Sequence, residues 1–152
     1  MSSFLNSSQI TNLQDTFQNH FDTFSSGISN YVTVFREPTK LINNPNSLNL
    51  FGYSEDSFNQ TDITYQPNTG FYKCMVISPQ SMNSKQFTEL KFSLDKNEIY
   101  IKVENDCRDF IQSQKVEYMT VNDIKYNLVS TYPQTQNYFG LKFYYFKLES
   151  TQ

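Results

Sequence analysis

Hydrophobic and polar positions near the start of the chain follow the spacing of an amphipathic helix. Apolar side chains recur every three or four residues, and polar side chains occupy the positions between them. The apolar positions are Ile10, Leu13, Phe17, Phe21 and Phe24. The pattern predicts a helix over about residues 9–26, which Ser8 or Thr11 can cap at its start and Gly27 can follow at its end.

Runs of β-branched and aromatic residues predict the first strands. One run covers residues 31–36 and is followed by Pro38, and a second covers residues 71–77 and is followed by Pro79. Proline cannot donate a ladder hydrogen bond, so we expect each strand to end there. Residues 85–94 fit either a helix or a strand, and we favour a strand.

Residues 37–70 lack a clear period and are rich in asparagine and serine, which predicts a long loop. A loop of that length in a compact domain indicates either a function or a misassigned element. The segment is nevertheless too apolar for a solvated linker, because it contains Leu48, Leu50, Phe51, Tyr53 and Phe58. We expect it to pack against something, such as another chain.

The last third of the chain has the most regular pattern. Residues 98–104 alternate, with Ile99, Ile101 and Val103 on one face, which predicts a half-buried strand. Asn105 or Asp106 can cap a short helix that follows. It would hold Cys107, Phe110 and Ile111.

Two further strands, 115–121 and 123–131, meet at Asn122-Asp123, a pair that tolerates the positive φ angles of a tight hairpin. Alternation places Val116, Tyr118 and Thr120 on one face of the first arm. Ile124, Tyr126 and Leu128 share a face of the second. A final strand over 141–148 is continuously apolar, which predicts burial on both faces or against a partner.

Length and charge narrow the class of protein. A chain of 152 residues is long enough for one domain with a real core. A net charge of −3 argues against a sequence-independent grip on nucleic acid, which needs clustered basic side chains. The chain has neither an apolar run of about 18 residues nor a signal-like amino terminus, so we expect synthesis in a cytoplasm and no membrane partner.

Candidate chemistry is sparse, and we expect neither an enzyme nor a cofactor. His20 lies at the edge of the apolar stripe, where a boundary role is the usual one, and no GxSxG or Walker sequence occurs. Glu104, Asp106 and Asp109 are interpreted as helix-start charges rather than as a metal site. Cys74 and Cys107 lack CxxC spacing, which argues against zinc and a disulfide framework and favours apolar packing.

The aromatic residues near the carboxyl end have two interpretations. Flanked by Lys142 and Lys147, they can form a stacking platform for single-stranded nucleic acid, or they can form core and interface. The residues are Phe139, Phe143, Tyr144, Tyr145 and Phe146. The acidic net charge favours core and interface.

Residues 116–129 read Val-Glu-Tyr-Met-Thr-Val-Asn-Asp-Ile-Lys-Tyr-Asn-Leu-Val. This segment resembles the strand-turn-strand hairpin of head-to-tail connector proteins of tailed bacteriophages, particularly the stopper or head-completion type. Phe143-Tyr-Tyr-Phe-Lys-Leu148 resembles the closing strand. Residues 32–36, Phe51-Gly-Tyr53 and residues 71–76 add to the likeness. The amino-terminal helix and the long loop exceed the minimal stopper pattern, so adaptor, stopper and tail-completion roles stay open.

We expect a mainly β fold: a small antiparallel β-barrel or sandwich with the amphipathic helix packed outside. One domain would span residues 1–152, with the helix at about 9–26, the inserted loop at about 37–70 and the β-core at 71–149. The resemblance implies a structural virion protein in the neck between capsid and tail. There it would form a homo-oligomeric ring, usually of six or twelve copies.

The resemblance also implies the partners of this ring: a portal or adaptor protein, a tail or tail-completion protein, and genomic DNA in the channel. We expect intersubunit or portal contacts from apolar residues without an obvious destination inside the chain. They are Leu48, Leu50, Phe51, Tyr53, Phe58, Phe143, Tyr144, Tyr145 and Phe146. The main alternative is a small β-barrel protein that binds single-stranded nucleic acid.

Overall fold

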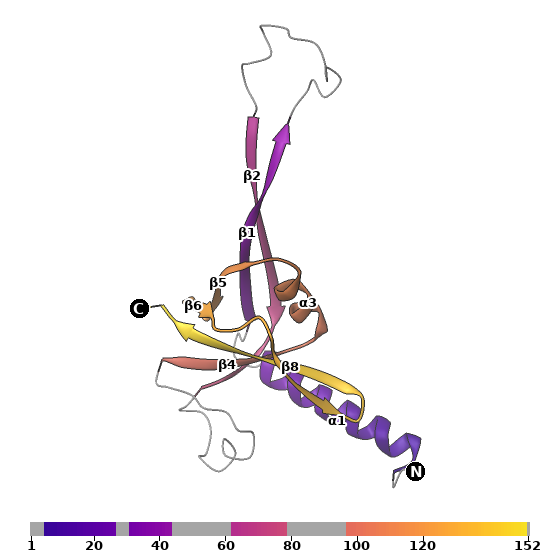
Figure 1. The fold of residues 1–152 in the computed structure, drawn as a ribbon. Helices are drawn as coiled ribbons and strands as arrows, with labels where there is room; N and C mark the ends of the chain where they lie inside the picture. The colour runs from indigo at the N-terminus through magenta and orange to yellow at the C-terminus, as the bar shows by residue number, and fades with distance from the viewer. Residues whose placement is uncertain (1–4, 27–30, 44–61, 79–96, 152) are drawn as a thin grey trace, which may run out of the picture.

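The computed structural model describes residues 5–26, 31–43, 62–78 and 97–151 (Figure 1). It has the predicted class: mainly β, with one antiparallel sheet of eight strands and an amino-terminal helix. Residues 44–61 and 85–94, for which a loop and a strand were predicted, lie outside the described residues.

The sheet has the strand order β2-β1-β5-β6-β8-β4-β3, and β7 also pairs with β8. Its end strands, β2 and β3, are consecutive along the chain and separated only by Cys74, so the sheet coils back on itself without closing into a barrel. The elements are α1 (Ser7–Ser26), β1 (Tyr31–Asn43), β2 (Asp62–Lys73), β3 (Met75–Ile77), β4 (Glu98–Val103), α3 (Asn105–Ser113), β5 (Val116–Val121), β6 (Ile124–Leu128), β7 (Gln134–Tyr138) and β8 (Leu141–Ser150).

Both predicted helices form, but their starts differ from the prediction. A reciprocal pair precedes α1: the Gln9 amide donates to Asn6 Oδ1 at 2.8 Å, and the Asn6 amide donates to Gln9 Oε1 at 3.0 Å. This capping box, rather than Ser8 or Thr11, satisfies free amides at the helix start. The N-cap of α3 is Glu104, without a side-chain capping bond.

The structure contradicts a strand end at Pro38 and a loop over all of 37–70. The β1–β2 ladder runs from Tyr31↔Lys73 to Asn43↔Asp62, with its irregularity between Arg36 and Thr39. Pro38 falls within this irregularity, where the missing amide interrupts pairing without ending the strand. The two segments thus form one long hairpin.

Strand β4 has the predicted alternation, but it is buried on both faces rather than half-buried. Ile99, Ile101 and Val103 face the main core, whereas Tyr100 and Lys102 face a second cluster that includes Phe21 of α1. Side chains of α1 therefore cover a face of the sheet that alternation alone assigns to solvent. The two-sided burial predicted for β8 is also confirmed, because its side chains pack in the main core on one face and in the second cluster on the other.

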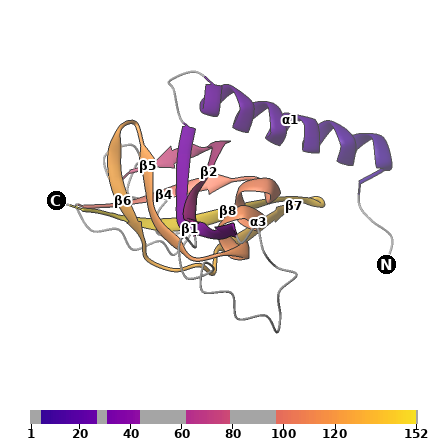
Figure 2. The ribbon, with the colours of Figure 1, turned by 90° about the horizontal axis from the view of Figure 1, so that it is seen from above.

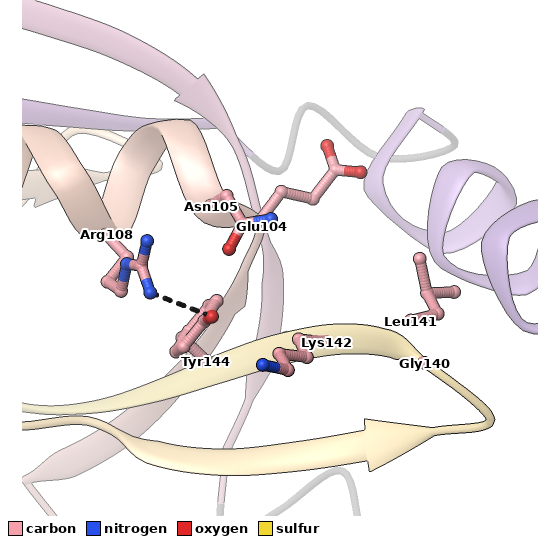
Figure 3. A pocket seen from close by; sticks show the side chains of 7 residues that line it. All are labelled: Glu104, Asn105, Arg108, Gly140, Leu141, Lys142 and Tyr144. Carbon is pink, nitrogen blue, oxygen red and sulfur yellow. Dashed lines mark hydrogen bonds between the residues drawn. The ribbon is translucent and has the colours of Figure 1, made fainter.

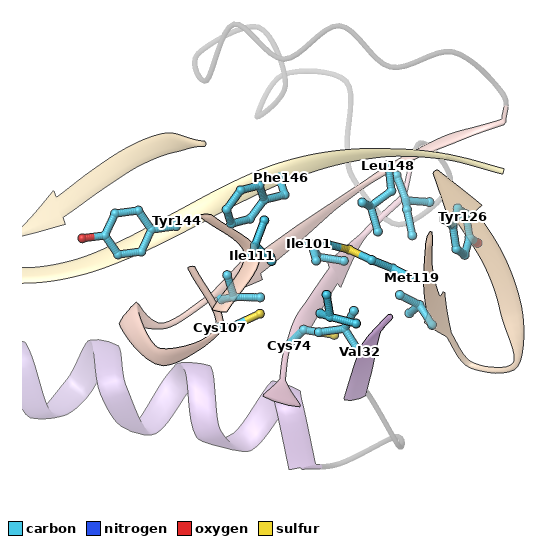
Figure 4. Close-up of a cluster of buried hydrophobic side chains, with 14 residues drawn as sticks. Val32, Cys74, Ile101, Cys107, Ile111, Met119, Tyr126, Tyr144, Phe146 and Leu148 are labelled. Carbon is cyan, nitrogen blue, oxygen red and sulfur yellow. The ribbon is translucent and has the colours of Figure 1, made fainter. Parts of the chain in front are cut away.

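The main core lies inside the coiled sheet (Figure 4). Side chains from β1, β4, β5 and β8 meet there with two from α3, Cys107 and Ile111. Its buried members are Val32, Val34, Cys74, Ile99, Ile101, Val103, Cys107, Ile111, Met119, Val121, Tyr126, Tyr144, Phe146 and Leu148. The second cluster, Phe21, Ile77, Tyr100, Phe143 and Tyr145, joins α1 to the outside of the sheet.

The β5–β6 hairpin turns at Asn122 and Asp123, with φ angles of 50° and 64°, which confirms the predicted tight turn. In β5 the side chains of Met119 and Val121 enter the core. Tyr118 precedes Met119, so its side chain points the other way and lies on the outside of the sheet.

Candidate interaction surface

The β1–β2 hairpin extends beyond the rest of the molecule (Figure 1). The last pair between β1 and β5 is Arg36↔Val116, whereas pairing with β2 continues to Asn43↔Asp62. At about 3.3 Å per residue, the two-stranded part from Arg36 to Asn43 is roughly 23 Å long. We call residues 39–43 and 62–66 the arm.

The arm exposes apolar side chains on both faces. Leu41 is opposite Thr64 and is 42% exposed, and Tyr65 is opposite Lys40 and is 64% exposed. Because adjacent strand positions point to opposite faces, Leu41 and Tyr65 project in opposite directions. A two-stranded ribbon is marginally stable in water without a further packing surface. Within the described residues, the arm is therefore a two-stranded ribbon with apolar side chains exposed on both faces.

Arg36 anchors the base of the arm to α3. Its guanidinium lies 3.5 Å from the Phe110 ring centroid and donates to Phe110 O at 3.0 Å and to Asn68 Oδ1 at 2.6 Å. It also donates to Ser113 Oγ. A planar, multiply bonded guanidinium fixes both strands relative to the helix. The direction of the arm is thus set by the body of the protein.

A second feature, which is partly exposed, lies on the outside of strands β2, β1 and β5. Tyr31 stacks on Phe71 with ring centroids 4.6 Å apart, and Phe35 stacks on Tyr118 at 4.4 Å. Phe71 is 66% exposed. We call these four residues the aromatic face.

The aromatic face lies opposite the buried side of β1, because Val32 and Val34, which alternate with Tyr31 and Phe35, are fully buried. Helix α1 packs instead over the second cluster, on β3, β4 and β8 (Figure 2). At the edge of the face, Lys125 Nζ lies 3.9 Å from the Tyr118 centroid. The face is thus an aromatic surface with a basic margin.

The structure corrects the interpretation of the carboxy-terminal aromatic residues. Phe143, Tyr144, Tyr145 and Phe146 are 0%, 5%, 5% and 1% exposed. Phe143 and Tyr145 pack in the second cluster, and Tyr144 and Phe146 pack in the main core. The prediction of core packing is therefore confirmed for these four residues, and the argument that they lack a destination within the chain is wrong. Phe139, the fifth residue of the predicted stacking platform, is 48% exposed.

The other predicted contact residues have no described placement. Leu48, Leu50, Phe51, Tyr53 and Phe58 all lie outside the described residues. Sequence reasoning missed the aromatic face, although the alternation of Tyr31, Thr33 and Phe35 with Val32 and Val34 is visible. The odd-numbered and the even-numbered positions of this strand both carry apolar side chains, so the alternation does not say which of the two faces is exposed.

An open pocket of about 410 Å³ lies between α3 and the start of β8 (Figure 3). Arg108 Nη1 donates to Tyr144 Oη at 2.9 Å, and Arg108 also pairs with Asp109. Glu104 Oε1 accepts from Gln18 Nε2 of α1 at 2.9 Å. Glu104, Asp106 and Asp109 do not converge, and the described part of the chain contains no cluster of three or more metal-ligating side chains.

Lys102 is a buried cation on the second face of β4. It is 6% exposed, and its Nζ lies 3.9 Å from the Phe143 centroid and 5.5 Å from that of Tyr138. Burial lowers the pKa of Lys102 to about 8. No described acidic group forms an ion pair with it, so aromatic faces are its main electrostatic partners.

Both cysteines are free and buried in the main core, as apolar packing predicts. Burial raises the pKa of the Cys74 thiol to about 12 and raises that of Cys107 as well. His20 lies on the exposed side of α1, with its ring 4.5 Å from that of Phe24. These placements match the structural roles assigned from the sequence.

No family model matches the chain, and no curated protein or solved structure matches it significantly. Within the described residues, no helix has the length and apolar character needed to cross a membrane. The projecting arm and the aromatic face are therefore the features on which a functional proposal rests.

Proposed function

We propose that the protein is a structural subunit of the head-to-tail connector of a tailed bacteriophage. In this role identical subunits form a ring in the neck of the virion, usually of six or twelve copies. The ring joins the portal or adaptor protein to the tail or tail-completion protein, and genomic DNA passes through its channel.

The observation that carries this proposal is the arm. Its ribbon projects from a small body, exposes Leu41 and Tyr65 on opposite faces, and is held at its base by Arg36. A rigidly directed but unsupported ribbon is a suitable assembly element, because contact with a neighbour supplies the packing that it lacks alone. The segments that resemble connector proteins form β5, β6 and β8 of the body, and β5 pairs with β1 at the base of the arm.

The charge of the chain fits a subunit that surrounds DNA without gripping it. Its net charge is −3, and a strongly basic channel lining would retain the DNA by neutralising phosphates. An acidic or neutral lining lets the duplex slide during packaging and ejection.

Shortening the arm tests the proposal. In the variant, an Asn-Gly pair replaces all residues between Thr39 and Gln66, which are partners in the ladder. Asn-Gly suits a tight hairpin, and Arg36 and the body stay intact. Native mass spectrometry should show a ring for the intact chain and the monomer mass for the variant. Heads supplied with the variant should fail to join tails. Unchanged ring mass together with unchanged joining would refute the assignment.

A second candidate is single-stranded nucleic-acid binding, now at a different place from the one predicted. The observation that favours it is the aromatic face with Lys125 at its edge, since exposed aromatic rings beside lysine can stack bases. Filter binding of single-stranded DNA over a range of salt decides between the two. Submicromolar, salt-sensitive binding by a monomer would favour this candidate.

A further inference from the structure

We infer that the pocket between α3 and the start of β8 binds a phosphate group, either as the free ion or as part of a small phosphomonoester. The pocket has a volume of about 410 Å³, which is within the range of small-molecule sites (Figure 3). This site goes beyond the proposed connector role and does not depend on a ring.

The start of α3 forms one wall of the pocket. Pairing of β4 with β8 ends at Val103↔Tyr144, and α3 begins two residues later, beside the first part of β8. The N-cap Glu104 makes no side-chain capping bond, and no group in the described part of the chain accepts from the backbone amides of residues 105–107. Free amides at the start of a helix point outward along its axis and favour an anion.

Tyr144 supplies a donor that is independent of the helix. It is 5% exposed and lines the pocket, and its hydroxyl oxygen accepts from Arg108 Nη1 at 2.9 Å. Because the oxygen is the acceptor in that bond, the hydroxyl proton needs another acceptor, and none of the described residues provides one. A buried hydroxyl with an unused proton at the wall of a pocket is satisfied when an anion binds there.

Arg108 and Lys142 add positive charge. Asp109 holds Nε and Nη2 of Arg108, which leaves Nη1 directed at Tyr144 and the pocket. Lys142 lies two residues before Tyr144 on β8, so the two side chains share a face of the strand, and Figure 3 shows the Lys142 amine on the Tyr144 side. Lys142 forms no ion pair with any residue that the structure describes.

The acidic groups near the pocket face elsewhere. Glu104 lines it, but its Oε1 accepts from Gln18 Nε2 at 2.9 Å, and Figure 3 shows its carboxylate turned toward α1. Neither Asp106 nor Asp109 lines the pocket. Donors therefore reach it from the helix start, from the buried hydroxyl and from the strand. A tetrahedral oxyanion can accept from all three directions, whereas a planar carboxylate accepts mainly in its own plane.

Isothermal titration calorimetry of the intact chain tests the site, with inorganic phosphate and glycerol 3-phosphate as probes. Tyr144→Phe removes only the hydroxyl and should raise Kd about tenfold, because a hydrogen bond to a charged group is lost. Lys142→Met should raise Kd about threefold at low salt and less at high salt. Tighter binding of glycerol 3-phosphate assigns the pocket to a phosphomonoester, and equal affinities assign it to the free ion.

Two matched controls change the same residue types outside the pocket. Tyr126→Phe alters another buried tyrosine, at 8% exposure, and Lys125→Met removes an exposed lysine of β6, so both should bind as the wild type does. As an independent measurement, hydrogen exchange of residues 105–107 should slow when glycerol 3-phosphate is bound.

Two results would overturn the inference. One is the absence of both saturable heat and exchange protection with either probe. The other is an unchanged Kd in Tyr144→Phe and Lys142→Met. Neither result bears on the mass of the assembled protein, so failure of this site and failure of the connector role are distinguishable.

Discussion

Replacing Lys102 by methionine should stabilise the protein. The side chain is buried between β4 and α1, and its Nζ faces the rings of Phe143, Tyr138 and Phe21 at 3.9, 5.5 and 5.8 Å from their centroids. Methionine has a similar length, fits against aromatic rings and carries no charge to desolvate.

The magnitude follows from the pKa of Lys102. Burial lowers it from 10.5 to about 8, and each unit corresponds to about 1.4 kcal/mol, so the charged form costs about 3 kcal/mol in the native state. The cation–π contacts offset about 1–2 kcal/mol of this cost. We therefore expect Lys102→Met to raise the free energy of unfolding by about 1–2 kcal/mol at pH 7.

The pH dependence provides the sharper signature. Between about pH 8 and 10.5 the unfolded chain keeps the Lys102 proton and the native protein has lost it, so native stability rises with pH there. The advantage of the methionine variant should be greatest below pH 8 and shrink as the pH rises. Burial raises the pKa of Tyr145 and Tyr100 in both proteins, and this opposing effect cancels in the difference.

Urea unfolding followed by circular dichroism at pH 7, 8 and 9.5 measures this difference. Lys142→Met, an exposed lysine on the neighbouring strand, is the matched control and should change stability by less than about 0.5 kcal/mol. A loss of stability on Lys102→Met at pH 7, or a difference that does not depend on pH, would show that the aromatic contacts outweigh desolvation.

Other parts of the fold give further predictions. Arg36→Lys keeps the charge but loses the planar stack on Phe110 and the guanidinium hydrogen bond to Asn68, so the free energy of unfolding should fall by about 1–3 kcal/mol, measured by thermal unfolding. Retained stability would show that the arm needs no such anchor. Asn6→Ala removes the capping box and should cost about 1 kcal/mol, whereas Asn6→Asp should not. Cys74 and Cys107 should react with Ellman's reagent only after denaturant is added, and rapid reaction of the native protein would contradict their burial.

Local sequence determined the elements that depend on local physics. The three-and-four spacing around Phe17 and Phe21 is sufficient to specify α1, because only one face of that helix can be buried. Asn122 and Asp123 adopt positive φ angles, as the turn between β5 and β6 requires. The alternation in β4 likewise predicted a strand whose core-facing residues were correct, and the continuous apolar run of β8 predicted a strand buried on both faces or against a partner.

Only the tertiary structure decided which faces are covered. Alternation in β4 assigns one set of side chains to the core, but α1 covers the other set as well, and Lys102 is buried there as a result. The same helix and the coiling of the sheet bury Phe143 to Phe146, which the sequence alone leaves without a destination. The arm was missed because its two segments pair only with each other and are flanked by Pro38 and Pro67, so local propensity indicates a loop. Pairing across the long hairpin overrides that propensity. The rest of the fold leaves Leu41 and Tyr65 of the arm and Phe71 of the aromatic face exposed.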